Sequence, residues 1–137
     1  MSKNKFQIGF LLLALFSGLL FYGCRYDNQE DMIDCSMVVP ATISYSRDIQ
    51  PIFNQHCSGN DCHTGPYPQK NLNLDPAHSY ASLMKPGSGY VDTIRPTRSL
   101  LYSSMNSKSD PMPPNGRLSK CTVESVLNWI QQKAKNN

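Results

Sequence analysis

The stretch Cys57-Ser58-Gly59-Asn60-Asp61-Cys62-His63 decides how the rest of this chain folds. It places two thiols and an imidazole in one short loop. Two cysteines followed at once by a histidine are the pattern that attaches haem covalently, because each thiol adds to one vinyl group as a thioether. The second thioether then holds the backbone beside the ring, where the adjacent histidine meets the iron. Four residues separate the cysteines instead of the usual two, and the longer gap loops out without disturbing Cys62-His63.

Two other uses of Cys57, Cys62 and His63 stay open at this point, namely a disulfide and a zinc site. A zinc site would need a fourth ligand, conceivably His56 or Cys121. Structural zinc sites usually draw their ligands from two spaced pairs, which this segment does not supply by itself. We therefore favour haem over both alternatives.

Residues 1–23 have the composition of an export signal. Lys3 and Lys5 precede an unbroken apolar run of 16 residues at positions 8–23. As a helix this run would be about 24 Å long at roughly 1.5 Å per residue, which is short for a hydrocarbon layer of about 30 Å. We therefore expect a cleaved signal peptide, with an uncleaved N-terminal anchor as the alternative.

The segment Leu20-Phe21-Tyr22-Gly23-Cys24 resembles the cleavage site of bacterial lipoproteins. The resemblance implies that Cys24 becomes the acylated N-terminal residue. The mature protein would then be exported and anchored to a membrane, on the periplasmic side or in the outer membrane. Arg25 directly after the cysteine favours the outer membrane, by analogy with other lipoproteins.

The formal net charge of +3 belongs largely to the signal. Without Lys3 and Lys5, 11 basic residues face 10 acidic ones, and the net charge is +1. The rest of the chain contains no basic cluster, so its composition gives no support for nucleic-acid binding. No feature indicates a small-molecule substrate, and we expect no enzymatic activity.

Five cysteines in an exported chain need partners. With Cys24 assigned to lipid, and Cys57 and Cys62 to haem, Cys35 and Cys121 remain. An even pair in an oxidising compartment favours a disulfide, which would join the N-terminal linker to the last helix. Two free thiols are the alternative.

The sequence predicts an all-α domain at residues 44–137, behind a flexible polar linker at residues 24–43. We expect three to five helices joined by long loops and no strand. A domain of about 90 residues with few aliphatic positions is marginal by itself, so a buried cofactor would complete its core.

Apolar periodicity and capping residues locate the helices. The predicted helices cover residues 49–56, with Ser46 or Asp48 as the cap, and residues 79–84, 99–105 and 119–135, the last capped by Ser119 or Thr122. The proline-rich segment 110–116 is predicted to be extended, because each proline restricts its own φ and the residue before it.

An ordered set of segments resembles one family, the small monohaem cytochrome c domains of the planctomycete-type group, which occur in Bacteroidetes-like exported lipoproteins. The segments are YSRDIQPIF, the C-x4-CH motif, LNLDPAHSYASL, RSLLYSSM, DPMPPNGRLS and VLNWI, within residues 45–134. The resemblance implies a cytochrome c-like fold wrapped around one covalent haem c. It also implies that Cys57 and Cys62 are the thioether anchors, His63 the proximal ligand and Met112 the distal ligand.

Other residues compete with Met112 for the distal position. Met84 and Met105 sit at helical spacing beside leucines or tyrosines, where methionine usually fills a core. His78 is a further rival, although Asp75-Pro76 indicates a helix cap there. We expect His56 to be packed or solvated, and Trp129 to pack in the core or against the haem pocket.

Histidine and methionine together would leave the iron six-coordinate, and the soft thioether favours Fe(II) and raises the reduction potential. We therefore predict an electron-transfer protein that meets other redox proteins transiently, without strong electrostatic steering. The alternatives are a haem-based sensor or binding module with a displaceable Met112, and a non-haem metal-binding surface lipoprotein.

Overall fold

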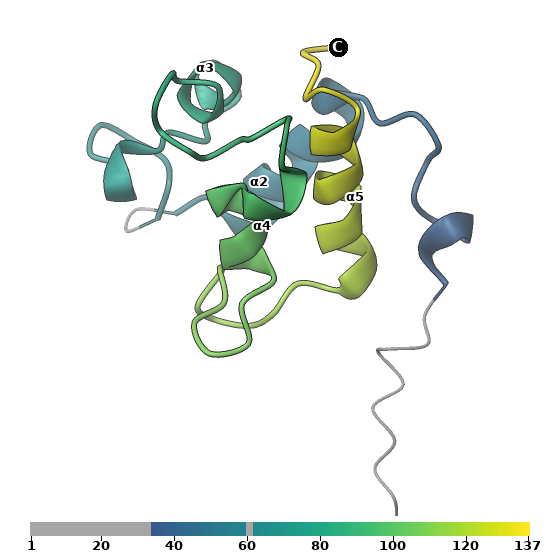
Figure 1. Cartoon of the computed structure of the whole chain (residues 1–137). Coiled ribbons are helices and arrows are strands. Elements are labelled where there is room, and N and C mark those ends of the chain that lie inside the picture. The colour runs from purple at the N-terminus through teal and green to yellow at the C-terminus, as the bar shows by residue number, and fades with distance from the viewer. Residues whose placement is uncertain (1–33, 60–61) are drawn as a thin grey trace, which may run out of the picture. The chain divides into compact units, whose positions relative to one another are not determined.

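The computed structural model describes residues 34–59 and 62–137, and these ranges contain helices and loops but no β-strand. The all-α class predicted from the sequence is therefore confirmed at this level. Four α-helices occur in these ranges (Figure 1): α2 (Gln50–His56), α3 (Ser79–Leu83), α4 (Leu100–Met105) and α5 (Lys120–Gln131). None of them combines the length and the apolarity that crossing a bilayer requires. The predicted signal peptide, Cys24 and the linker before residue 34 lie outside the described residues.

The helical segment that leads into the cysteine motif begins earlier than predicted. A π-helical turn, η3 (Tyr45–Ile49), runs directly into α2. Ser44 caps it, because the Ser44 hydroxyl accepts a hydrogen bond from the Arg47 N–H at 3.4 Å. The Asp48 carboxylate in turn accepts from the Ser44 N–H at 2.7 Å. The cap is therefore Ser44, and not Ser46 or Asp48 as predicted. The three polar side chains lie within about one helical turn, and residue type does not distinguish between them.

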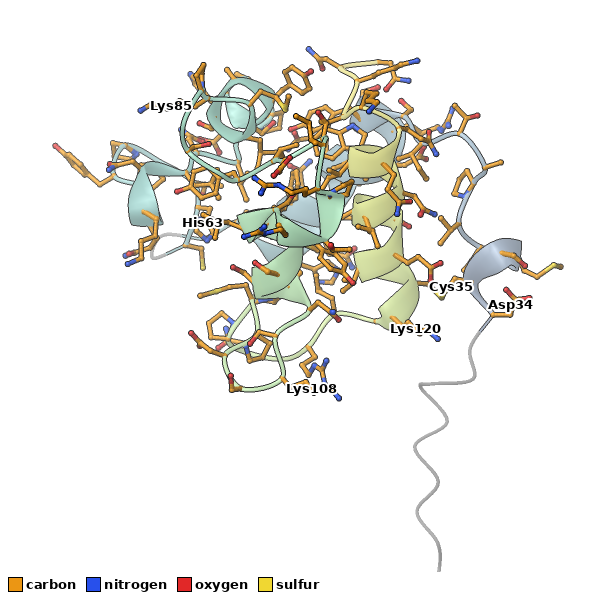
Figure 2. The ribbon with its side chains drawn as sticks, in the orientation of Figure 1. Asp34, Cys35, His63, Lys85, Lys108 and Lys120 are labelled. Atoms are coloured by element: carbon orange, nitrogen blue, oxygen red, sulfur yellow. A yellow bond between two sulfur atoms is a disulfide. The ribbon has the colours of Figure 1, made fainter. Side chains whose placement is uncertain are left out.

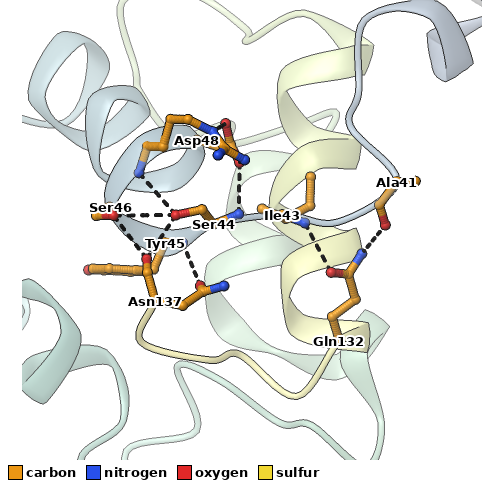
Figure 3. Close-up of polar contacts among 9 residues, drawn as sticks. Ala41, Ile43, Ser44, Tyr45, Ser46, Asp48, Gln132 and Asn137 are labelled. Carbon is orange, nitrogen blue, oxygen red and sulfur yellow. Dashed lines mark hydrogen bonds and ion pairs between the residues drawn. The ribbon is translucent and has the colours of Figure 1, made fainter.

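The segment before η3 is tied to the chain beyond α5 (Figure 3). The Asn137 carbonyl accepts hydrogen bonds from the Ser46 N–H at 3.0 Å and from the hydroxyls of Ser44 and Ser46 at 2.8 and 2.9 Å. The Gln132 Oε1 accepts from the Ile43 N–H at 3.0 Å. These bonds hold the start of the first helix against the end of the last one.

Cys35 and Ile43 are buried, although they lie in the segment that the sequence predicts to be a flexible linker. Cys35 is 4% exposed and Ile43 is 2% exposed. Cys35 forms a disulfide with Cys121 in the first turn of α5, with a Cα–Cα distance of 5.2 Å, as the cysteine count led us to expect. Two points of this segment are therefore attached to the helical unit, Cys35 by a covalent bond and Ile43 by burial in the core.

The core gathers buried side chains from η3, α2, α3, α4 and α5. Its largest fully buried side chains include Trp129, Phe53 and Ile49. The ring of Tyr45 lies 5.2 Å from that of Trp129 and 5.2 Å from that of Tyr80, between centroids. Aromatic pairs at such distances add attraction beyond the area that they bury. α5 contributes Trp129 to this cluster and packs against η3 and α4.

α5 ends at Gln131, four residues before the predicted end at Lys135. Lys133 and Ala134 adopt left-handed backbone angles, with φ of 72° and 46°, which a right-handed helix cannot include. The indole N–H of Trp129 donates to the Lys135 carbonyl at 2.9 Å and closes the turn. The predicted start is confirmed, because the Ser119 hydroxyl accepts from the Thr122 N–H at 3.2 Å.

A chain of buried polar groups joins the first helix to the loop after the cysteine motif. The Tyr45 hydroxyl donates to Ser79 Oγ at 2.6 Å, and the Ser79 hydroxyl donates to Gln50 Oε1. Gln50 Nε2 then donates to the Leu74 carbonyl at 3.1 Å. Since buried polar groups are costly unless they are paired, this chain fixes the loop at Leu74 relative to the core.

Candidate functional site

A cavity of about 180 Å³ opens among the cysteine loop, α4 and the loop that follows α4. Three of the residues singled out from the sequence line it: Cys57, His63 and Met112. Most of the remaining wall is aliphatic or aromatic, from Leu72, Leu74, Tyr90, Leu100, Leu101 and Met105. The fold therefore brings the thioether of Met112 to the same mainly apolar cavity as the thiol and the imidazole of the cysteine motif.

His63 is partly buried and lies beside α4 (Figure 2). Its Nδ1 is 3.2 Å from the Gln69 carbonyl oxygen. Because a carbonyl can only accept, the tautomer of the neutral imidazole that fits this contact has the proton on Nδ1 and the lone pair on Nε2. The His63 backbone is held as well, since its carbonyl accepts from the Leu74 N–H at 2.6 Å. His63 is thus a preset donor of one nitrogen lone pair, with the other nitrogen engaged.

The two cysteines of the motif differ in their surroundings. Cys57 ends α2, where its N–H donates to the Phe53 carbonyl at 2.9 Å. Burial raises the pKa of the Cys57 thiol to about 11, and the nearby thiol of Cys62 adds to the shift. At neutral pH this thiol is therefore protonated. Cys62 is partly buried and does not line the cavity, and neither cysteine is in a disulfide.

Met112 is anchored to α4 through its backbone. Its N–H donates to the Ser104 carbonyl at 3.0 Å, and its side chain is 39% exposed. The segment around it is not extended as predicted: the Met112–Pro113 peptide bond is cis, and the Gly116 N–H donates back to the Pro113 carbonyl at 3.4 Å. Proline restricts the φ of single residues, but it does not determine the direction of the chain across several residues.

The rivals of Met112 lie in different places. Met105 also lines the cavity, but it is 4% exposed and belongs to the core. Met84 is not among the lining residues, and neither is His78, whose side chain is exposed. Trp129 is fully buried in the core and does not contact the cavity.

Of the two candidates for a fourth zinc ligand, His56 and Cys121, the second is not available, because the Cys121 sulfur is bonded to Cys35. Within residues 34–59 and 62–137, no three His, Cys, Asp or Glu side chains gather as a metal-ion site. The donors at the cavity are one imidazole and thioether sulfurs, a set suited to the two axial positions of a haem iron.

Sequence reasoning missed Lys70, Tyr90 and Ser104, which line the cavity. Lys70 places a charged side chain at the wall, and the Ser104 carbonyl holds Met112. No spacing rule marks these positions, since Lys70 and Tyr90 lie in segments without periodicity.

Comparisons with protein-family models, with curated proteins and with solved structures gave no match.

Proposed function

We propose that this chain is an electron-transfer protein with a cytochrome c-like fold and one covalent haem c. Cys57 and Cys62 would attach the haem, with His63 and Met112 as axial ligands. The observation that carries the proposal is the presence of Cys57, His63 and Met112 in the wall of one mainly apolar cavity. The His63 imidazole and the Met112 thioether would be the two protein ligands that hold the haem iron.

Each residue at the cavity has a task in this function. Haem supplies one-electron exchange at its iron. The Gln69 carbonyl accepts from His63 Nδ1 and so leaves Nε2 as the nitrogen that would bind the iron. The Met112 thioether would favour the reduced metal. The leucines of the wall would limit access of water to the haem, which would disfavour the more highly charged oxidised state.

The proposed location is outside the cytoplasm, on a lipid anchor at Cys24 after removal of residues 1–23. The disulfide between Cys35 and Cys121 supports export, because disulfides persist in oxidising compartments. A mature net charge of +1 gives little long-range steering. We therefore expect transient encounters with redox partner proteins.

The direct test is production of the full chain in a bacterial host that matures c-type cytochromes. The purified protein should keep its colour after denaturation and extraction with acid acetone, and Cys57→Ala together with Cys62→Ala should abolish this retention. A colourless extracted protein would refute covalent haem. In the mature protein, Met112→Ala should remove the long-wavelength band of methionine-ligated ferric haem. Met84→Ala is the matched control, because Met84 does not line the cavity, and it should keep that band.

A haem-based sensor is the second candidate, since Met112 lies in a loop with 39% of its side chain exposed. A sensor requires displacement of the thioether by a small ligand. Carbon monoxide added to the reduced protein separates the two functions. An unchanged spectrum supports the electron carrier, and a shifted spectrum supports the sensor.

A further inference from the structure

The turn that orients His63 has an unfavourable backbone conformation. The 3-10 turn η4 (Gln69–Asn71) follows the cysteine loop, and within it Lys70 and Asn71 have φ of 57° and 56°. Most side chains with a Cβ atom disfavour this left-handed region, which asparagine enters more readily, so Lys70 in particular needs support from its surroundings. The carbonyl that accepts from His63 Nδ1 belongs to Gln69, directly before them.

Tyr90 supplies support from outside the turn. Its hydroxyl donates to the Lys70 carbonyl at 2.9 Å, and its side chain lines the cavity. The Tyr90 backbone is itself held by α4, because the Leu101 N–H donates to the Tyr90 carbonyl at 3.1 Å. Tyr90 thus connects the start of α4 to the carbonyl of Lys70. That carbonyl directly follows the Gln69 carbonyl, which contacts the imidazole of His63.

The turn has a second attachment, to the cysteine loop. The Gln69 N–H donates to the Cys62 carbonyl at 2.8 Å. Gln69 therefore contacts the motif through both its N–H and its carbonyl, and rotation of the peptide after it is opposed by Tyr90. Within the turn, the Leu72 N–H donates to the same Gln69 carbonyl at 3.1 Å, and the Asn71 N–H donates to the Pro68 carbonyl at 3.1 Å. Removal of the Tyr90 hydroxyl would leave these local bonds in place but would free the Lys70 carbonyl from its attachment to Tyr90.

We propose that Tyr90 is a positioning residue for His63: by holding the Lys70 carbonyl, it keeps the Gln69 carbonyl aimed at the Nδ1 proton. This inference rests on the proposed function, in which His63 binds the haem iron through Nε2. A hydrogen bond at the far nitrogen raises the basicity of a histidine ligand. Tyr90 therefore lowers the reduction potential of the bound haem, although it does not touch the ligand.

A matched control exists in the core. The Tyr80 hydroxyl also donates to a backbone carbonyl, that of Ala134, at 3.0 Å. Tyr80 does not line the cavity. Tyr80→Phe therefore removes the same kind of bond without any route to His63.

The experiment compares Tyr90→Phe, Tyr80→Phe and wild type as mature full-length proteins. Two quantities are measured: the reduction potential, and the solvent exchange rate of the His63 Nδ1 proton in the reduced protein, followed by NMR. In Tyr90→Phe the exchange should be roughly three- to tenfold faster, as expected for one weakened hydrogen bond, and the potential should rise. In Tyr80→Phe both should stay at their wild-type values.

Equal exchange rates and potentials in Tyr90→Phe and wild type would overturn the inference and leave the proposed function intact. A wild-type protein without covalent haem would overturn both. A third protein with 4-aminophenylalanine at position 90 restores a donor and decides the matter if Tyr90→Phe matures poorly. It should recover wild-type values, and failure to recover them counts against positioning by this hydrogen bond.

Discussion

The side of the molecule built on α5 and the side built on the cysteine loop use similar apolar residues, but their side chains meet different surroundings. Around α5, Trp129, Phe53 and Ile130 are fully buried against other side chains. At the cysteine loop, the leucines line a cavity, Met112 is 39% exposed, and two residues of one turn are left-handed. The first side is stabilised by its own packing, whereas the second has the features of a binding site.

The buried polar groups sharpen this contrast. Between η3, α2 and α3 they form a chain from Tyr45 through Ser79 and Gln50 to the Leu74 carbonyl, and no buried side-chain nitrogen or oxygen among the described residues lacks a partner. At the cavity, His63 uses one nitrogen internally and presents the other. We therefore expect substitutions in the core around Trp129 to change mainly the free energy of unfolding. Substitutions at the cavity should change mainly the properties of the site.

The largest effect on stability is expected at Trp129. Trp129→Ala removes a fully buried side chain and its hydrogen bond to the Lys135 carbonyl. It should lower the free energy of unfolding by about 3–5 kcal/mol, measured by denaturant titration. Tyr67, which is 91% exposed, is the control, and Tyr67→Ala should stay within about 0.5 kcal/mol of wild type. Equal losses at the two positions would contradict a core centred on α5.

Met105 and Met112 both line the cavity, and together they test the difference between the packed core and the candidate site. In the chain without haem, Met105→Ala should cost about 2–5 kcal/mol, because Met105 is 4% exposed. Met112→Ala should cost no more than about 0.5 kcal/mol, because Met112 is 39% exposed. After haem attachment, Met112→Ala should change the ferric spectrum, whereas Met105→Ala should leave it unchanged. A spectrum sensitive to Met105 instead would transfer the ligand role to that residue.

The disulfide should contribute about 2–4 kcal/mol, because it joins residues separated by 86 positions and restricts the unfolded chain. Cys35→Ser and Cys121→Ser should each lower the free energy of unfolding by that amount. The double variant should lose no more than either single one, since all three lack the same bond. Additive losses would show that the two sulfurs stabilise the fold separately.

The smallest effect is confined to alkaline pH. Burial raises the pKa of Tyr45 to about 12, above its ordinary value of 10.0. The folded state therefore holds this proton more tightly than the unfolded state. The resulting stability is fully present below pH 10 and is lost as the pH rises through about 12. Unfolding titrations between pH 9 and 12 should show a shallower decline for Tyr45→Phe than for wild type, and parallel declines would refute a buried hydroxyl.

The sequence predicted the helices well where local signals determine them. α3 and α4 lie where the apolar periodicity placed them, and Ser119 caps α5 as expected. The errors have two kinds of cause. α5 stops early because the chain turns at Lys133 and Ala134 and Trp129 binds the Lys135 carbonyl, a local arrangement that apolar periodicity does not reveal. Cys35 and Ile43 are buried because Cys121 and the core hold them, and these contacts join residues far apart along the chain.

The sequence also predicted only part of the candidate site. The motif at Cys57, Cys62 and His63, and the choice of Met112, came from residue types and their order along the chain. The partners of these residues did not, because the Gln69 and Ser104 groups that hold His63 and Met112 are backbone carbonyls. Every residue has such a carbonyl, so residue type gives no indication of which one will be used.

By itself, the sequence determined the helical class, the thiol–imidazole motif and the pair of cysteines left for a disulfide. These depend on spacing and side-chain chemistry over a few neighbouring residues. Only the tertiary structure decided that Met112 reaches the same cavity as His63, that Met105 shares it, and that Tyr90 supports the turn beside the imidazole. Those relations depend on how separate segments pack, and packing is settled by contacts between residues far apart along the chain.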